Sequence, residues 1–388
     1  MKTTFIHTAD WQLGKPFRGV EDDQKRAILQ NERMEVVRRM GKIAIDKKAS
    51  FVLVAGDLFD SSTATKATVS AACSAIGSIG IPVYVIPGNH DHGGPGGIWD
   101  QEFYLREQKE LAPNLHILLK SEPLELDNAV LFPCPLLRRH ESVDTTAWVR
   151  NLDLTRFDSK PLILLAHGSI QGFGAFGDDE EAEGGAINEI DLDRLPNGIF
   201  DYIALGDWHG TKEIQKEIWY SGTPEPDRFP KSEDHQQGNI LVVNAGKNET
   251  SEVEIVSAGC MKWHVEEFYF HDDSGISILK QKLTDCMGTT TNRDLIKLSI
   301  EGSLGLGAYS EMEELLDSMK ARLIRLKLVN QVTISPSEDE IISLTRRAND
   351  PLLSSVASKL VETAKLENAD AVIARIALRE LYTACLTK

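Results

Sequence analysis

The chain has 388 residues, more than one hydrophobic core usually supports, so two or three domains are expected. Hydrophobic residues make up 41% of the sequence, too many for a disordered chain, and no apolar run reaches the roughly 20 residues that a membrane-spanning helix needs. The net charge of −17 argues against tight unassisted binding to DNA, because a protein that holds phosphates alone usually presents a basic face.

The five cysteines do not form a disulfide or zinc framework. They are scattered and odd in number, and none forms a Cys-x-x-Cys pair, a pattern typical of reduced thiols. The start of the chain is too short and too polar for a signal peptide. These features together predict a cytoplasmic protein.

The first half of the chain alternates strand and helix signals. Apolar runs at residues 3–8, 50–55 and 81–86 predict buried parallel strands, and residues 23–48 and 65–78 between them predict helices. This order predicts an open α/β sheet with right-handed crossovers.

Residues 115–135 are interpreted as a β-meander, because three short apolar segments follow one another there. Residues 172–185 hold five glycines and an acidic run, which favours a solvated loop or, alternatively, a mobile lid. Further strands, some of them in a second sheet, are expected at residues 161–166, 200–205, 239–243, 252–256 and 263–270.

The composition changes near residue 271. A helix–strand–helix–strand pattern over residues 276–334 predicts a small α+β domain, and the rest of the chain favours helices. The expected domains are therefore residues 1–268, 269–336 and 337–388.

Polar side chains that can bind metals or move protons follow five of the predicted strands. In an open α/β sheet, sites form at the carboxyl ends of the strands, so these side chains are expected to meet. The residues are Asp10, Gln12, Asp57, Asp60, Asn89, His90, His167, Asp207 and His209.

The mixture of ligand types is informative. Divalent metals of hard and borderline character accept carboxylate, amide oxygen and imidazole together. Two such ions about 4 Å apart can bind both sides of a phosphate and produce hydroxide at neutral pH. The pattern therefore predicts a metal-dependent phosphoesterase with two divalent metal ions.

The order Asp10, Gly-Asp57, Gly-Asn89-His90, His167 and Gly-x-x-His209 resembles the calcineurin-like metallophosphoesterase superfamily. The motif around Asp10 and the run at residues 56–60 are most similar to the SbcD-type DNA repair exonuclease branch. The resemblance covers roughly residues 3–265. It implies an α/β fold, namely a two-sheet metallophosphoesterase sandwich with a small α+β capping domain and a C-terminal helical element.

The resemblance also implies roles for the matching residues. Asp57 would bridge the two metals, with Asp10 and His209 on the first and Asn89 and His167 on the second. His90 would protonate the leaving oxygen after in-line attack by a metal-bound hydroxide, and Asp60 would orient His90.

Two positions depart from the family pattern. The family usually has Asp-x-His where this chain has Asp10-x-Gln12, and Gly-His-x-His where this chain has Gly206-Asp207-Trp208-His209. Gln12 either offers an amide oxygen to the first metal or leaves a water there, and Asp207 can replace the usual histidine directly. The exchange makes the site harder and more negative, which favours manganese or magnesium over zinc.

Some features keep two interpretations. Lys15, Arg18, Arg138 and Arg139 are candidate phosphate contacts, but scattered surface cations are the preferred interpretation. Residues 220–229 form a turn-rich segment, which is a structural loop or, as in the resembled branch, lies close to the site.

The expected function is a metal-dependent, exonuclease-like DNA nuclease acting in DNA repair. In the resembled family the C-terminal helices dock onto an SbcC-like coiled-coil ATPase, which would explain how an acidic nuclease holds DNA. A homodimer stays an open alternative, and no membrane is implied. The rival functions are a phosphoesterase for small molecules, favoured by the acidic charge, and a non-catalytic scaffold subunit, favoured by the changes at Gln12 and Asp207.

Overall fold

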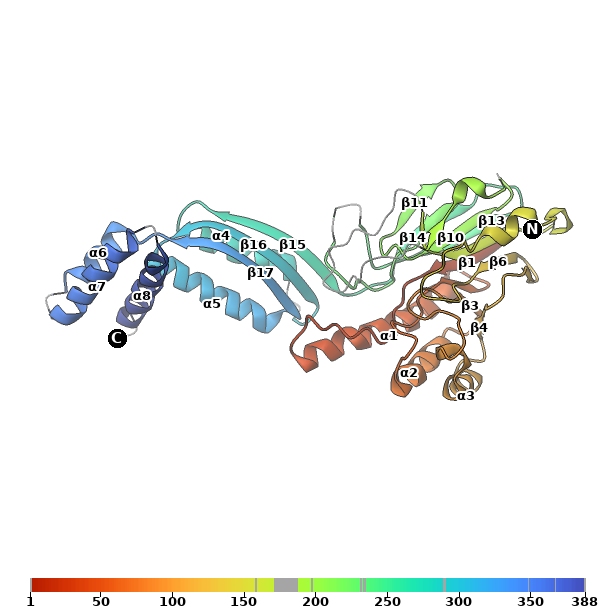
Figure 1. Cartoon of the computed structure of the whole chain (residues 1–388), viewed down its shortest axis with the longest axis horizontal. Helices are drawn as coiled ribbons and strands as arrows, with labels where there is room; N and C mark the ends of the chain where they lie inside the picture. The colour runs from red at the N-terminus through yellow and green to blue at the C-terminus, as the bar shows by residue number, and fades with distance from the viewer. Residues whose placement is uncertain are drawn as a thin grey trace. The chain divides into compact units, whose positions relative to one another are not determined.

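The computed structural model describes residues 2–157, 159–170, 188–196, 198–230, 232, 235–288, 291–347, 349–366 and 368–386. The acidic loop expected within residues 172–185 lies outside these ranges. The chain divides into two compact units, Met1–Met261 and Lys262–Lys388, which are described separately (Figure 1). None of the described helices is both long enough and apolar enough to cross a membrane.

The first unit contains two six-stranded sheets. The first sheet has the order β14 (Glu252–Ser257), β13 (Asn239–Gly246), β1 (Lys2–Thr8), β2 (Val52–Ala55), β3 (Val83–Ile86), β4 (Leu115–Ile117). The second has the order β11 (Lys212–Gln215), β12 (Ile218–Tyr220), β10 (Tyr202–Gly206), β7 (Leu162–His167), β6 (Val130–Cys134), β5 (Leu124–Glu125). β8 (Ser169–Ile170) and β9 (Glu189–Ile190) form a separate short pair.

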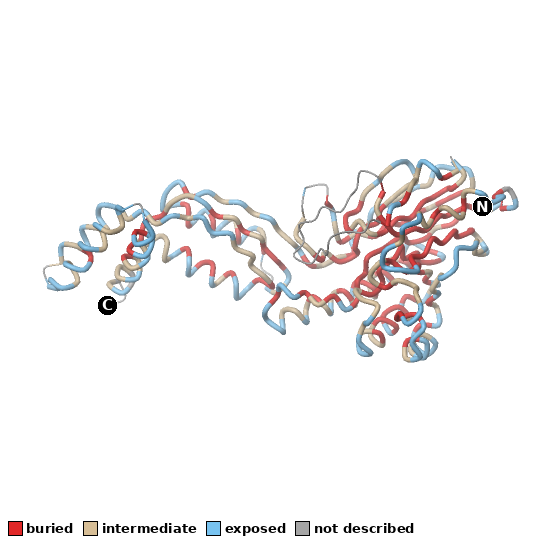
Figure 2. The backbone as a smooth tube through the Cα atoms, viewed as in Figure 1, coloured by how far each residue is buried: buried red, intermediate tan, exposed pale blue. Residues whose placement is uncertain are grey.

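The central strands are apolar throughout because both of their faces are covered. Every residue of β2 and of β7 is buried, as expected for strands in the interior of a sandwich. Between the two sheets lies a core that includes Phe5, Leu53 and Leu165. Figure 2 shows this burial concentrated along the strands of the first unit.

Helices cover the outer face of the first sheet. They are α1 (Asp23–Asp46), α2 (Lys66–Gly77) and α3 (Glu102–Leu111). α1 begins after Asp22, whose carboxylate accepts hydrogen bonds from the backbone N–H groups of Gln24 and Lys25. Its buried face contributes Val36 and Met40 to the core beneath the sheet.

The interpretation of residues 115–135 as a β-meander is wrong. β4 pairs in parallel with β3 at the edge of the first sheet, whereas β5 and β6 form an antiparallel hairpin in the second sheet. Short apolar segments show where strands lie but not which strands they pair with, so the sequence did not separate the two sheets here.

The second unit begins with a three-stranded parallel sheet of β15 (Lys262–Phe270), β16 (Asp294–Leu304) and β17 (Arg325–Ile334). α4 (Gly275–Met287) and α5 (Leu306–Arg322) cover one face of it. The sequence placed β15 in the first domain, but its full length pairs with β16, so it belongs to the second unit.

Three helices follow, namely α6 (Glu338–Thr345), α7 (Pro351–Ala364) and α8 (Ala369–Leu386). The expected fold class is thereby confirmed, because two packed sheets are followed by a small α/β layer and a helical element.

Candidate metal centre

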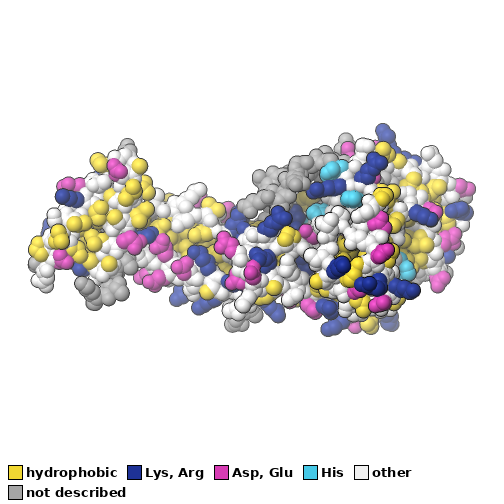
Figure 3. Space-filling model, turned by 60° about the horizontal axis from the view of Figure 1, so that its bottom comes forward, with side chains coloured by type: hydrophobic (Ala, Val, Ile, Leu, Met, Phe, Trp, Pro, Cys, Tyr) yellow, Lys and Arg dark blue, Asp and Glu magenta, His cyan; other side chains and the backbone are white. Residues whose placement is uncertain are grey.

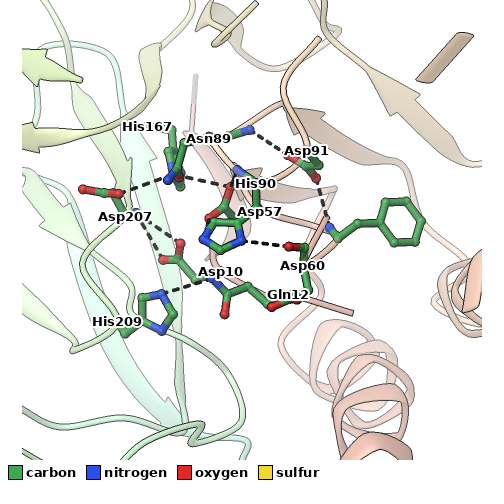
Figure 4. Close-up of polar contacts among 12 residues, drawn as sticks. Asp10, Gln12, Asp57, Asp60, Asn89, His90, Asp91, His167, Asp207 and His209 are labelled. Atoms are coloured by element: carbon green, nitrogen blue, oxygen red, sulfur yellow. Dashed lines mark hydrogen bonds and ion pairs between the residues drawn. The ribbon is translucent and has the colours of Figure 1, made fainter. Parts of the chain in front are cut away.

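The predicted site residues come together at the carboxyl ends of strands from both sheets. β1, β2 and β3 lead into Asp10, Asp57 and Asn89, while β7 ends at His167 and β10 leads into Asp207. Figure 4 shows their side chains converging from the two sheets. The parallel arrangement explains this meeting, since parallel strands present their carboxyl ends at one edge.

The loops that carry these residues adopt unusual backbone conformations. Asp10 and Asp57 have φ of 54°, Gln12 has 40° and Asp207 has 100°, all in the left-handed region that non-glycine residues rarely adopt. Such conformations cost stability and concentrate at functional sites. Gly56 is required for a different reason: a Cβ there would lie 2.1 Å from Nδ1 of His167.

One side of the centre gathers the acidic residues and is called the acidic half: Asp10, Asp57, Asn89, His167 and Asp207. Ligand atoms of Asp10, Asp57 and His167 lie within 4.8 Å of one another, and all three residues are buried. Nε2 of His167 lies 2.9 Å from Oδ1 of Asn89, 3.6 Å from Oδ1 of Asp57 and 3.7 Å from Oδ1 of Asp207. These are the atom types and the close convergence that a divalent cation needs.

The imidazole of His167 is oriented for ligation. Its Nδ1 lies 2.7 Å from the carbonyl oxygen of Ala55 and donates to it, which leaves Nε2 facing the carboxylates. The backbone N–H of Asp207 donates to both carboxylate oxygens of Asp10 at 3.2 Å. The acidic half is therefore held in place by main-chain groups as well as by its own side chains.

The ionisation of the acidic half indicates an excess of negative charge. Burial, with the neighbouring carboxylates Asp57 and Asp207, raises the pKa of Asp10 to about 8. Burial opposes the charged form of His167, but the surrounding carboxylates outweigh it and raise the pKa of His167 to about 9. Protons on Asp10 and His167 thus offset part of the negative charge in the protein alone, and a divalent cation would replace them, so the acidic half fits a metal ion.

His90 is held at the rim of the centre. Its Nδ1 donates to the main-chain carbonyl oxygen of Asp60 at 2.8 Å, and its Nε2 lies 3.9 Å from Oδ2 of Asp57. Asp60 therefore contacts His90 through its backbone carbonyl. Burial lowers the pKa of His90, but the Asp57 charge and the Asp60 carbonyl more than compensate, so the net pKa is raised.

The opposite side of the centre, called the basic half, consists of Gln12, Lys15, His209, Asp227 and Arg228. Nζ of Lys15 donates to Oε1 of Gln12 at 2.9 Å and lies 3.2 Å from Oδ2 of Asp227. Nδ1 of His209 lies 3.0 Å from the same Asp227 oxygen, and Nε of Arg228 lies 3.1 Å from the other. In Figure 4, Gln12 and His209 lie on the other side of Asp10 from His167 and Asn89.

Asp227 and Arg228 were not recognised from the sequence as parts of the centre, and Lys15 was named only as a candidate phosphate contact. Lys15 is 8% exposed, so its interpretation as a scattered surface cation is wrong. Residues 220–229 do lie at the site, because Oγ1 of Thr223 donates to the carbonyl of Asp10 at 2.9 Å. The adjacent opposite charges at positions 227 and 228, inside a turn-rich segment, were the available signal.

Arg33 is a further residue that the sequence analysis missed. This α1 side chain is 1% exposed, and its guanidinium donates to the carbonyls of Trp11 at 2.8 Å and of Asp10 and Glu225 at 3.0 Å. It joins the loop that carries Asp10 to the segment that carries Asp227, and so fixes the positions of the two halves relative to each other.

The remaining predicted cations lie outside the centre. Arg18, Arg138 and Arg139 are exposed. Arg138 and Arg139 line a cleft of about 780 Å³ together with His92, two residues beyond His90.

Comparisons with known proteins identify the family to which the chain belongs. The sequence model of the calcineurin-like phosphoesterase family matches residues 3–211, more than half of the chain. The chain is 27% identical over 244 residues to the SbcD subunit of the nuclease SbcCD from Staphylococcus epidermidis, an alignment that covers 56% of this chain and 60% of the relative. It thus spans less than two thirds of that relative. A solved structure, TT1561 of Thermus thermophilus, aligns at 14% identity over 66% of this chain and 100% of its own length, with a TM-score of 0.40.

Proposed function

The chain belongs to the calcineurin-like phosphoesterase family, and we propose that it is a metal-dependent DNA nuclease of the exonuclease type that acts in DNA repair in the cytoplasm. The observation that carries the hydrolase part is the buried convergence of Asp10, Asp57 and His167 beside His90. The nuclease part is supported by the similarity to a protein named as a nuclease subunit.

The metal belongs in the acidic half. The residues that would hold it are Asp57, Asn89, His167 and Asp207, with Asp10 beside them. Three carboxylates, one amide and one imidazole form a hard ligand set, which favours manganese, with magnesium as the alternative. When bound, such an ion polarises the phosphate and lowers the pKa of the attacking water.

His90 is placed to act as the general acid. Because its Nδ1 proton is given to the Asp60 carbonyl, Nε2 carries the proton that can move. The raised pKa keeps a fraction of the imidazole protonated near neutral pH, and its side chain is 34% exposed, so a leaving oxygen can reach it. Asp60 positions His90 through its backbone, and Asp57 stabilises the imidazolium.

The cleft beside His92 supports a substrate larger than a simple phosphate ester. Its volume of about 780 Å³ and its two arginines provide space and positive charge next to the loop of His90. The overall charge of −17 nevertheless works against a firm grip on DNA, so a partner protein is part of the proposal.

The C-terminal helices are the proposed docking element for an SbcC-like coiled-coil ATPase. Exposed apolar side chains gather over them in Figure 3. Leu352 is 76% exposed, Ile373 64% and Val372 56%. Co-purification of the full chain with the ATPase, against a chain stopped before α6, tests this, and equal recovery of the ATPase would refute it.

The DNA substrate is tested by digestion of labelled DNA in Mn²⁺, with hydrolysis of an aryl phosphodiester run in parallel. We expect the wild type to degrade DNA and His90→Ala to fail, while His116→Ala, at an exposed histidine away from the centre, retains activity. Equal digestion by wild type and His90→Ala would mean that the activity is contamination. Hydrolysis of the aryl ester alone would favour the small-molecule rival.

A further inference from the structure

The position expected for the first metal contains side chains that repel one. By the family pattern that position lies between Gln12 and His209. The oxygen through which Gln12 could bind a metal, Oε1, instead accepts a hydrogen bond from the ammonium of Lys15 at 2.9 Å. An oxygen held by an ammonium cannot also donate its electrons to a metal without bringing two cations into contact.

His209 faces the same difficulty. Its Nδ1 lies against Asp227, so Nε2 is the nitrogen left to bind a metal. That atom lies 3.4 Å from a terminal nitrogen of Arg228 and 3.5 Å from Nε2 of Gln12. The lone pair of the imidazole is thus directed at two N–H donors.

Asp227 explains how these cations stay in place. Its carboxylate is fully buried and contacts Lys15, Arg228 and His209. The carboxylate of Asp60 also lies 4.0 Å from the ammonium of Lys15, so acidic side chains hold both cations beside Gln12 and His209. In the acidic half, among the described residues, the basic groups that pair with Asp57 and Asp207 are His90 and His167.

We propose that Lys15 and Arg228 fill the first metal position, so that the centre binds one divalent ion, in the acidic half. The two side chains supply to a bound phosphate the positive charge that a first metal would otherwise supply. This inference rests on the metal-dependent part of the proposed function and not on DNA as the substrate.

The test measures how many Mn²⁺ ions bind to the full chain after a chelator has removed all metals. Every protein carries Cys286→Ser, because His264, Glu266 and Cys286 form another group in the described chain that could hold an ion. Calorimetric titration gives the number of ions, and electron paramagnetic resonance distinguishes an isolated Mn²⁺ ion from a spin-coupled pair. We expect one isolated ion, lost in Asp57→Asn.

A second variant asks whether the cations are what exclude the other ion. Gln12→His combined with Lys15→Met, Asp227→Asn and Arg228→Gln restores the family histidine and removes the charges. We expect a second, coupled ion, whereas Arg18→Met, at an exposed position in the same loop, leaves the count at one. Circular dichroism checks that the variant folds.

Two ions in the wild type, or one ion in a folded combined variant, would overturn the inference while leaving the proposed hydrolase intact. No ion in the wild type would overturn both. One ion without phosphodiester hydrolysis would support the inference and remove the enzymatic proposal.

Discussion

The acidic and basic halves of the centre are built by the same loops, yet one gathers carboxylates and the other contains an ammonium and a guanidinium. The loop after β1 gives Asp10 to the acidic half and Gln12 to the basic half, and the loop after β10 gives Asp207 and His209 in the same way. The backbone therefore supplies two equivalent positions. What each position accepts is decided by further side chains, above all Lys15 of the first loop and the pair Asp227 and Arg228 from another segment.

The contrast between the halves shows why a ligand motif should be judged together with its neighbours. Asp227 holds Lys15 and Arg228 near His209, so a histidine predicted to bind a metal faces cationic side chains. Across the centre, the described basic partners of Asp57 and Asp207 are the histidines His90 and His167.

The largest effect is expected from breaking the acidic half. Asp57→Asn removes the carboxylate nearest to both His167 and His90, so we expect metal binding and phosphodiesterase activity to fall to background. Asp46→Asn, at an exposed position at the end of α1, is the control and should change neither. Retained metal content in Asp57→Asn would place the ion elsewhere.

Replacing His90 separates proton transfer from metal binding. With His90→Gln we expect kcat to fall by about 10²–10⁴-fold, the usual contribution of a general acid. The manganese count should stay unchanged, because His90 is not among the expected ligands. A fall in metal content as large as the fall in kcat would make His90 a ligand instead.

Removing Arg33 tests the connection between the halves. Arg33→Met removes three buried hydrogen bonds, to the carbonyls of Trp11, Asp10 and Glu225, so we expect a loss of about 3 kcal/mol in the free energy of unfolding. Arg38→Met removes a more exposed arginine of the same helix, which pairs with Glu35 one turn away, and should cost little. Urea denaturation measures both, and equal losses would contradict the role given to Arg33.

The smallest effect is expected from His7, a buried histidine in the core beside the centre. Burial lowers the pKa of His7 to about 3, although its contact with the Leu205 carbonyl opposes the shift. Below pH 6.5, the ordinary pKa of histidine, the unfolded chain therefore binds a proton at His7 that the folded chain does not bind. The free energy of unfolding consequently decreases as the pH falls from 6.5 toward 3.

The size of this effect is about 1.4 kcal/mol per pH unit within that pH range. Urea denaturation in the presence of a chelator, between neutral pH and mild acid, measures the free energy of unfolding. We expect the wild type to lose that much more of it per pH unit than His7→Gln does. His271→Gln, at an exposed histidine, is the control and should follow the wild type. Parallel curves for the wild type and His7→Gln would show that His7 is not held neutral.

Much of the centre could be predicted because its ligands follow strands with clear apolar patterns. The ends of β2 and β7 are marked by uninterrupted buried runs, so Asp57 and His167 could be placed at one edge of a sandwich. The pairing of β4 with β3 could not be predicted in this way, since partner choice depends on the tertiary fold.

The basic half was missed for a physical reason. Lys15 and Arg228 are charged residues in loops, and such residues are usually exposed. Lys15 is buried beside Asp227, which lies more than two hundred positions away in the sequence, and only the folded chain brings the two side chains to 3.2 Å. Pairing across that separation leaves no local pattern.

The most direct test of the unequal halves is a crystal structure of the full chain grown with manganese, with anomalous diffraction measured to locate the metal. We expect one anomalous peak, among Asp57, Asn89, His167 and Asp207, with Lys15 still hydrogen-bonded to Gln12. A second peak between Gln12 and His209, with Lys15 and Arg228 displaced, would contradict this expectation.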